Sequence, residues 1–285
     1  MKPNANAPAA GTRPEGAGND VEASRRVREL FGAIAPRYDL LNHLLSFSCD
    51  RLWRWRAARR VGRALRARAR VLDLCCGTGD LAFALEDEAK RQGGGAQIVA
   101  ADFVPAMLVR ARRKAAERSS GAGFVAADAL HLPFPDASFD LVALAFGFRN
   151  LANYAKGIAE LRRVLRPEGV LAILEFGEPP GRLFGGLYRF YFQRILPAIG
   201  GWVSGSRSAY GYLPASVARF PSPEELTLQL RAAGFASVQF ERWSAGIVAF
   251  HLAERPAAPR QGRPELGAAS GETDLTLRPS EGWMS

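Results

Sequence analysis

The sequence predicts an α/β fold, a doubly wound seven-stranded sheet, and two observations carry that prediction. From Val71 onward, short apolar runs alternate with amphipathic stretches of helical length, a pattern typical of parallel strands covered by helices on both faces. The last two apolar runs are separated only by Trp243–Gly246. A parallel return needs a crossover of about a dozen residues, so the last strand is expected to run antiparallel.

The chain that precedes the sheet is predicted to be helical. Val21–Ala35 and Arg51–Ala69 have helical composition, and Pro36–Ser46 joins them. Together these segments form a helical N-terminal preface before the first strand.

Seven strands are expected, each a short apolar run: Val71–Cys75, Gln97–Ala101, Gly123–Ala126, Phe139–Ala145, Val170–Phe176, Ser237–Arg242 and Ile247–Ala253. Four helices are expected between them: Asp80–Arg91, Pro105–Glu117, Tyr154–Leu165 and Pro223–Ala233. Arg182–Trp202 carries an apolar stripe at helical spacing and is predicted to be a helical insertion before the sixth strand.

One domain is expected at residues 25–255. Residues 1–24 and 256–285 are rich in small residues and proline and are predicted to be disordered tails. Residues 1–24 also lack an apolar core, so the sequence indicates neither a signal peptide nor a membrane span there.

The formal net charge of +10 is unusual for a chain of 285 residues, and many of its arginines lie at 51–70, interleaved with Trp53 and Trp55. We interpret this run as a solvated helix face; anionic lipid or nucleic acid are alternative partners. No zinc-finger, basic-zipper or RNP-type motif supports nucleic acid. Cys49, Cys75 and Cys76 are too few for a disulfide framework or zinc site and fit a reducing cytoplasm.

The turn after the first strand is the first candidate binding element. Gly77 and Gly79 allow a sharp turn and a close backbone approach to a ligand, and the helix that follows directs free N–H groups at it. Asp73 adds a carboxylate to the same crevice, which favours a ligand carrying an ammonium or sulfonium group. An NAD enzyme, which shares this glycine spacing, and a tight turn without a ligand are the alternatives.

Two further acids follow the next two strands. Asp102 stands where a carboxylate accepts hydrogen bonds from both ribose hydroxyls of a nucleotide, a feature that NAD and S-adenosylmethionine share. Asp128 and Ala129 stand where an adenine edge is met. The absence of a Tyr-x-x-x-Lys pair disfavours a short-chain dehydrogenase, and the reversed last strand is typical of methyltransferases.

The stretch Leu132–Asp140 resembles the adenine side of S-adenosylmethionine-dependent methyltransferases. More specifically, the chain is similar to the ubiquinone/menaquinone biosynthesis C-methyltransferases over roughly Val27–Glu254. The motifs that carry this resemblance occur in the family's order: Tyr38–Ser46 with Trp53, Leu72–Asp80, Phe146–Asn150, Arg163–Gly169 with Leu174–Phe176, Tyr210–Ser216 and Ala245–His251.

The resemblance implies a methyl donor, S-adenosyl-L-methionine, no metal, and methylation of a ring carbon of a polyprenylated quinol. That acceptor is demethylmenaquinol or the equivalent benzoquinol of ubiquinone synthesis. The resemblance assigns the donor to Asp73, Gly77, Thr78, Gly79, Asp102, Asp128 and Ala129. Arg149 and Asn150, in a matching motif, are the candidates for the quinol, with Arg149 stabilising the developing anion; a helix-capping or surface-paired arginine is the alternative. Tyr38, Asn42 and Tyr210 are candidates to cover the ring, with ordinary packing and turn formation as the alternative.

Six positions depart from the family pattern: Asp50, Cys75, Cys76, Ala145, Glu168 and Gly177. Ala145 stands where relatives often place a serine that contacts the cofactor, which puts one cofactor hydrogen bond in doubt. His43, His131 and His251 show no metal-ligand spacing and are interpreted as core or surface residues.

Two alternative functions stay open at this point: a methyltransferase of the same fold that acts on another lipid or small molecule, and an adenosine- or RNA-binding module without turnover. Residues 182–202 are too short and too charged to span a membrane. They are expected to hold an isoprenoid tail, to rest on a bilayer, or to pack on the sheet edge. A cytoplasmic protein with peripheral contact at the inner membrane face is expected, nucleic acid is not, and a homodimer is compatible with this interpretation.

Overall fold

The computed structural model describes residues 11–191, 194 and 207–258. Seven strands form one sheet in the order β3-β2-β1-β4-β5-β7-β6. Their bounds are β1 (Arg70–Leu74), β2 (Gln97–Asp102), β3 (Gly123–Ala126), β4 (Phe139–Ala145), β5 (Leu165–Phe176), β6 (Ser237–Trp243) and β7 (Val248–Glu254). β7 pairs antiparallel with both β5 and β6, whereas the pairs among β1 to β5 are parallel. The predicted sheet with a reversed last strand is confirmed.

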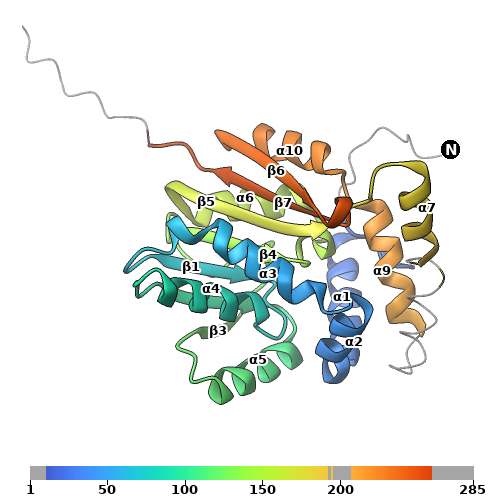
Figure 1. Ribbon diagram of the computed structural model, residues 1–285, viewed down its shortest axis with the longest axis horizontal. Helices are drawn as coiled ribbons and strands as arrows, with labels where there is room; N and C mark the ends of the chain where they lie inside the picture. Colours follow the sequence, from blue (N-terminus) through green and yellow to red (C-terminus); the bar gives the residue numbers. More distant parts are fainter. Residues whose placement is uncertain (1–10, 192–193, 195–206, 259–285) are drawn as a thin grey trace, which may run out of the picture.

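Helices cover both faces of the sheet (Figure 1). α3 (Cys49–Arg60), α4 (Asp80–Arg91) and α5 (Pro105–Glu117) lie on one face, and α6 (Tyr154–Val164) and α10 (Pro223–Ala232) lie on the other. The strands supply both layers because successive side chains point to opposite faces. Val71 is buried in the layer under α3 and α4, and its neighbour Leu72 is buried in the layer under α6 and α10.

Four helices gather beyond the edge where the parallel strands end (Figure 1). They are α1 (Asp20–Ile34), α2 (Tyr38–Leu45), α7 (Arg182–Phe190) and α9 (Arg207–Arg219). A short 3₁₀ turn, Ala35–Arg37, joins α1 to α2. In open α/β sheets ligands bind at this edge, so these four helices cover the place where a site is expected.

The predicted helix over Arg51–Ala69 is wrong in its length. α3 ends at Arg60, and the chain continues through a 3₁₀ turn at Gly62–Ala64. A Cβ atom on Gly62 would lie 2.8 Å from Oε1 of Glu88, so the chain passes close to that side chain of α4. Leaving the helix at this point also buries Val61 and Leu65 in the core.

The predicted disordered segment at 1–24 extends too far. α1 begins at Asp20, capped by the side chain of Asn19, and the buried residue Thr12 donates its backbone N–H to the Leu151 carbonyl at 2.8 Å. The composition of residues 1–24, rich in small residues and proline, gives no sign of these contacts, because their partners lie far along the chain. Residues 1–10 and 259–285 lie outside the described residues, so the tail predictions there are not addressed, and the same holds for most of the predicted helical stretch after Phe190.

One buried histidine makes the stability of this fold depend on pH. His251 lies on β7, with Nε2 2.9 Å from the Pro223 carbonyl oxygen. Burial lowers the pKa of His251 from 6.5 to about 4. The unfolded chain therefore binds more protons than the folded chain between these two values.

We expect the free energy of unfolding to fall as the pH drops from 6.5 to about 4, by up to about 3 kcal/mol from this group. Urea unfolding of His251→Gln across that range should show a shallower loss than the wild type. His131→Gln, which alters an exposed histidine, should keep the wild-type curve. Equal pH dependence in all three proteins would contradict the assignment.

Candidate active site

Two cavities adjoin at the carboxyl edge of the sheet. The first lies between the loops that follow β1 to β4 and helix α1; it has about 650 Å³ of empty space, part of it open to solvent. The second has about 1810 Å³, also partly open to solvent, and a largely apolar lining from α1, α2, α3, α7 and α9. Tyr38 lines both cavities and also a small recess around Asp73. The side chain of Tyr38 therefore marks the junction of the three spaces.

The glycine turn after β1 is held by Asp102 at the end of β2. Gly77 and Gly79 have φ values of 54° and 89°, in the left-handed region that favours glycine. The backbone N–H groups of Gly77 and Val104 donate to the two carboxylate oxygens of Asp102 at 2.8 and 2.9 Å. Since a carboxylate oxygen accepts more than one hydrogen bond, Asp102 keeps acceptor capacity toward the first cavity, which it lines.

Asp73 is a buried acid without a partner. Neither of its carboxylate oxygens has a hydrogen-bond partner among the described residues. Burial raises the pKa of Asp73 well above its usual value, and the Ala82 backbone and Arg54 oppose this only in part. An unpaired buried carboxyl group is costly. The recess that it lines is therefore suited to a ligand that brings a hydrogen-bond donor or a cation.

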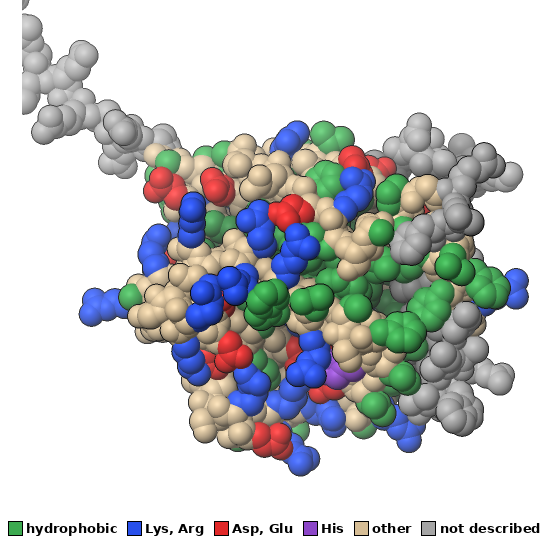
Figure 2. Space-filling view, in the orientation of Figure 1, with side chains coloured by type: hydrophobic (Ala, Val, Ile, Leu, Met, Phe, Trp, Pro, Cys, Tyr) green, Lys and Arg blue, Asp and Glu red, His purple; other side chains and the backbone are tan. Residues whose placement is uncertain are grey.

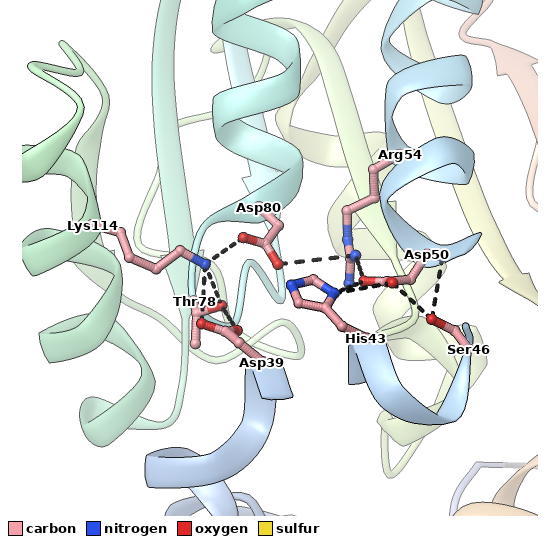
Figure 3. Close-up of polar contacts among 8 residues, drawn as sticks. All are labelled: Asp39, His43, Ser46, Asp50, Arg54, Thr78, Asp80 and Lys114. Carbon is pink, nitrogen blue, oxygen red and sulfur yellow. Dashed lines mark hydrogen bonds and ion pairs between the residues drawn. The ribbon is translucent and has the colours of Figure 1, made fainter. Parts of the chain in front are cut away.

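Thr78 joins the glycine turn to helix α2 (Figure 3). Its hydroxyl donates to Oδ1 of Asp39 at 2.5 Å and accepts from Nζ of Lys114 at 3.1 Å. Lys114 also forms an ion pair with Asp80. The Thr78 side chain is thus occupied by protein partners, and what it offers at the Asp73 recess is chiefly its backbone.

Asp50 and Arg54 form a buried pair beside this turn (Figure 3). Nη1 of Arg54 donates to Asp50 at 2.5 Å, Ser46 donates to Asp50 at 2.7 Å, and Nδ1 of His43 lies 3.0 Å away. Burial would raise the pKa of Asp50, but Arg54 and these hydrogen bonds lower it overall. Arg54 lines both the Asp73 recess and the second cavity. Its position was not predicted, although the i, i+4 spacing of Asp50 and Arg54 hints at the pair.

The same region holds the one group of His, Cys, Asp and Glu side chains, among the described residues, whose atoms are close enough to share a metal ion. Its members, His43, Asp50 and Asp80, have ligand atoms within 4.8 Å of one another. Arg54 contacts Asp50 and lies 4.0 Å from Asp80. The guanidinium therefore already supplies positive charge to both acids.

Arg149 is fixed in the wall of the second cavity. It lies in the 3₁₀ turn Phe148–Asn150 after β4, and its Nη1 is 2.9 Å from Oε2 of Glu175 on β5. Burial would lower the pKa of Arg149, but Glu175 raises it overall, so the side chain stays protonated. Glu175 was not among the predicted site residues. An acid inside the apolar run Val170–Phe176 was the signal for it.

Asn150 lies on the first cavity and is oriented by a chain of hydroxyl groups. The Tyr212 hydroxyl donates to Oδ1 of Asn150 at 3.0 Å and lies 2.9 Å from the hydroxyl of Thr12. Tyr212 and Thr12 were both missed, because their contacts span long stretches of sequence. The side chain of Tyr210, predicted over the ring, lies outside the described residues.

The remaining predicted residues lie around the same spaces. Asp128 and Ala129 line the first cavity, and Asp128 accepts the Leu130 N–H at 2.9 Å, which fixes the turn. Asn42 lines the second cavity and hydrogen-bonds to Tyr38. Ala145 lines the Asp73 recess without a hydroxyl group to offer. Apart from Tyr210, the predicted candidates thus border one of these three spaces or the glycine turn between them.

Part of the arginine-rich run is engaged with acids of the same chain. Arg56 and Arg60 pair with Glu241, and Arg66 pairs with Asp140. These contacts support the interpretation of that part as a solvated, ion-paired face.

Comparisons with known proteins agree on one family. Residues 19–255 match the model of the ubiE/COQ5 methyltransferase family. A Thermus thermophilus protein named demethylmenaquinone methyltransferase is 54% identical over 228 residues, which is 80% of this chain and all of that protein. A Deinococcus radiodurans protein of the same name is 48% identical and covers 84% of this chain and 96% of its own length.

A solved structure supports the fold. The structure of an S-adenosylmethionine-dependent methyltransferase from Thermotoga maritima, described as a possible histamine N-methyltransferase, superposes with a TM-score of 0.55. The match covers 80% of this chain and 99% of that one at 18% identity. At that identity the likeness concerns the architecture alone.

Close packing in the first cavity wall gives a testable prediction. A Cβ atom on Gly147 would lie 2.3 Å from the Cβ of Cys75. We expect Gly147→Ala to lower the free energy of unfolding by about 1–3 kcal/mol in urea titrations. Gly32→Ala is the control, because a Cβ there meets nothing within 4 Å.

Cys75→Gly should rescue Gly147→Ala, because it removes the clashing atom at a position whose φ of 57° already suits glycine. An unaltered unfolding curve for Gly147→Ala, or no rescue by the second change, would disprove the packing argument.

Proposed function

Because this chain belongs to the ubiE/COQ5 methyltransferase family, we propose that it transfers the methyl group of S-adenosyl-L-methionine to a ring carbon of demethylmenaquinol, giving menaquinol. The observation that carries the proposal is the junction at Tyr38 between a cavity bordered by carboxylates and an apolar cavity that contains a buried arginine. The names of the Thermus and Deinococcus relatives support this acceptor.

The residues of the first cavity and the recess fit the donor. The bound donor supplies an electrophilic methyl group on its sulfonium. Asp73, unpaired and buried, suits the ammonium of the methionine portion, and Arg54 in the same recess suits its carboxylate. Asp102 suits the ribose hydroxyls, and Asp128 with Ala129 suits the adenine. The backbone of Gly77, Thr78 and Gly79 lets the nucleoside approach the turn.

The second cavity suits the acceptor. Its lining is mainly aromatic and aliphatic, with polar groups at a few points that include Asn42 and Arg149, which is the composition expected of a site that orients a largely apolar ligand. We place the quinol ring beside Tyr38, where the two cavities adjoin, and the prenyl tail along the apolar wall toward α7.

Arg149 would stabilise the ionised quinol. Attack by the ring carbon requires electron density from an ortho or para hydroxyl group that loses its proton. Arg149 stays charged and is a poor base, so its role is to stabilise the phenolate. Its ion pair with Glu175 at 2.9 Å holds the guanidinium in place before the acceptor arrives. Asn150, oriented by Tyr212, is placed to assist.

No metal is required in this proposal, because the sulfonium activates the methyl group and Arg149 supplies the positive charge at the acceptor. We also propose a cytoplasmic location, which three free cysteines support. We propose in addition peripheral contact with the inner face of the membrane, and a homodimer. We propose one methyltransferase domain ending near residue 255.

None of the helices in the described part of the chain has both the length and the apolar character needed to cross a bilayer.

The direct test is methyl transfer from labelled S-adenosyl-L-methionine. We expect label in demethylmenaquinol and none in RNA or in a quinone already methylated at that carbon. Equal transfer to the demethylated benzoquinol would extend the acceptor class to ubiquinone precursors. Absence of label in any quinol, with label in another lipid, would overturn the proposed acceptor.

Arg149→Ala should separate chemistry from donor binding. We expect kcat to fall by about 10²- to 10³-fold, the scale for losing one group that stabilises an anion in the transition state, while calorimetric donor affinity stays within threefold of the wild type. Arg113→Ala removes an exposed arginine and should change neither quantity. Wild-type turnover in folded Arg149→Ala would show that the side chain is structural.

A further inference from the structure

Helix α2 exposes a stripe of large apolar side chains to solvent. Leu40 and Leu44, at i and i+4, share one face of the helix, and Phe47 follows just past the helix end at Leu45. The three side chains are 60%, 49% and 80% exposed. Leu41, the next residue along the helix, faces inward and is buried. Packing in the protein interior accounts for the apolar character of Leu41. It does not account for the exposed apolar side chains, and a group of this size marks a contact surface.

The stripe continues into the wall of the second cavity. Phe47, Leu187 and Phe190 line that cavity, yet the last two are 65% and 58% exposed. The helices that carry them are tied together, because the Tyr191 hydroxyl donates to the Leu45 carbonyl at 2.9 Å. The inside of the cavity and the outer surface therefore form one continuous apolar region.

We define the α2–α7 surface as this outer region, with the members Leu40, Leu44, Phe47, Leu187 and Phe190. Figure 2 shows hydrophobic side chains gathered at the right of the molecule, between α2 and α7, with basic side chains near them. Arg51 lies in the first turn of α3, and Arg189 lies on α7; both are exposed. An apolar face flanked by cations, in a chain of net charge +10, is complementary to an anionic lipid surface.

The proposed acceptor favours a lipid occupant over a protein one. Each methylene group moved from a bilayer into water costs about 0.8 kcal/mol, so a long prenyl tail keeps the quinol in the membrane. An enzyme whose apolar cavity opens between exposed apolar helices can receive that tail without passing it through water. The eight residues of α2 are far too few to span a bilayer.

We propose that the α2–α7 surface docks on the surface of a bilayer that contains anionic lipid, with Leu40, Leu44 and Phe47 in the interfacial layer. The quinol then enters the second cavity laterally, between α2 and α7. The lateral entry of the quinol rests on the proposed function. The docking does not, because vesicle binding is measured without any acceptor.

The binding test uses the full chain and vesicles of phosphatidylcholine with or without 30% phosphatidylglycerol, a fraction of roughly the anionic content that polybasic surfaces respond to. Wild type should float with the anionic vesicles. The double variant Leu40→Ser/Leu44→Ser, whose residues do not line the cavity, should bind at least about tenfold more weakly.

The matched control is Val109→Ser/Leu228→Ser, which removes two equally exposed apolar residues, 65% and 63%, from α5 and α10. It should float as the wild type does. Flotation of Leu40→Ser/Leu44→Ser equal to the control would overturn the proposal. So would a wild-type dimer in analytical ultracentrifugation that this variant dissociates without any change in vesicle binding, since the surface would then be covered by a second copy.

A kinetic readout follows entry of the acceptor. With a long-chain quinol embedded in anionic vesicles, kcat/KM of Leu40→Ser/Leu44→Ser should fall by about tenfold, in step with vesicle binding. With a quinol that lacks prenyl units, presented in solution, kcat/KM should match the wild type. If the wild type methylates neither quinol, the proposed function fails while flotation still decides the docking; an equal loss with both quinols would overturn lateral entry.

Discussion

The arrangement of the site depends on one buried carboxylate. Asp102 accepts the N–H groups of Gly77 and Val104, and in doing so it fixes the turn after β1 against the turn after β2. A Cβ atom on Gly77 would lie 3.6 Å from the ring of Tyr38, so the turn also determines how closely α2 approaches. Without this carboxylate, nothing named here would hold the glycine turn at a fixed distance from the turn after β2, and the positions of the first cavity and of helix α2 depend on that distance.

Helix α2 transmits that constraint outward. Asp39 accepts a hydrogen bond from the Thr78 hydroxyl of the glycine turn. Tyr38 lies where the two cavities adjoin, and Leu40 and Leu44 lie on the exposed face of the helix. One short helix thus borders the nucleotide side, the acceptor side and the surface through which we propose the acceptor arrives.

The sheet and the residues of the glycine turn were predictable because they depend on local patterns. Strand and helix periods, glycines at a turn, and acids at strand ends are readable within a few residues of sequence. Glu175, Tyr212 and Thr12 were not predictable in the same way, because each acts through a partner far along the chain, such as Tyr212 with Asn150. The early end of α3 was likewise not predictable, because the burial of Val61 and Leu65 that accompanies it involves residues far along the chain, and no propensity within 51–69 shows it.

The central claim is that the carboxylate holding the glycine turn also holds the ribose of the methyl donor. Calorimetric titration of S-adenosyl-L-methionine into Asp102→Ala, beside Asp87→Ala as an exposed control, tests this most directly. We expect the affinity for S-adenosyl-L-methionine to fall by about one to two orders of magnitude in Asp102→Ala, the scale of losing hydrogen bonds to a charged group. In the control we expect it to be unchanged. Wild-type affinity in a folded Asp102→Ala protein would contradict it.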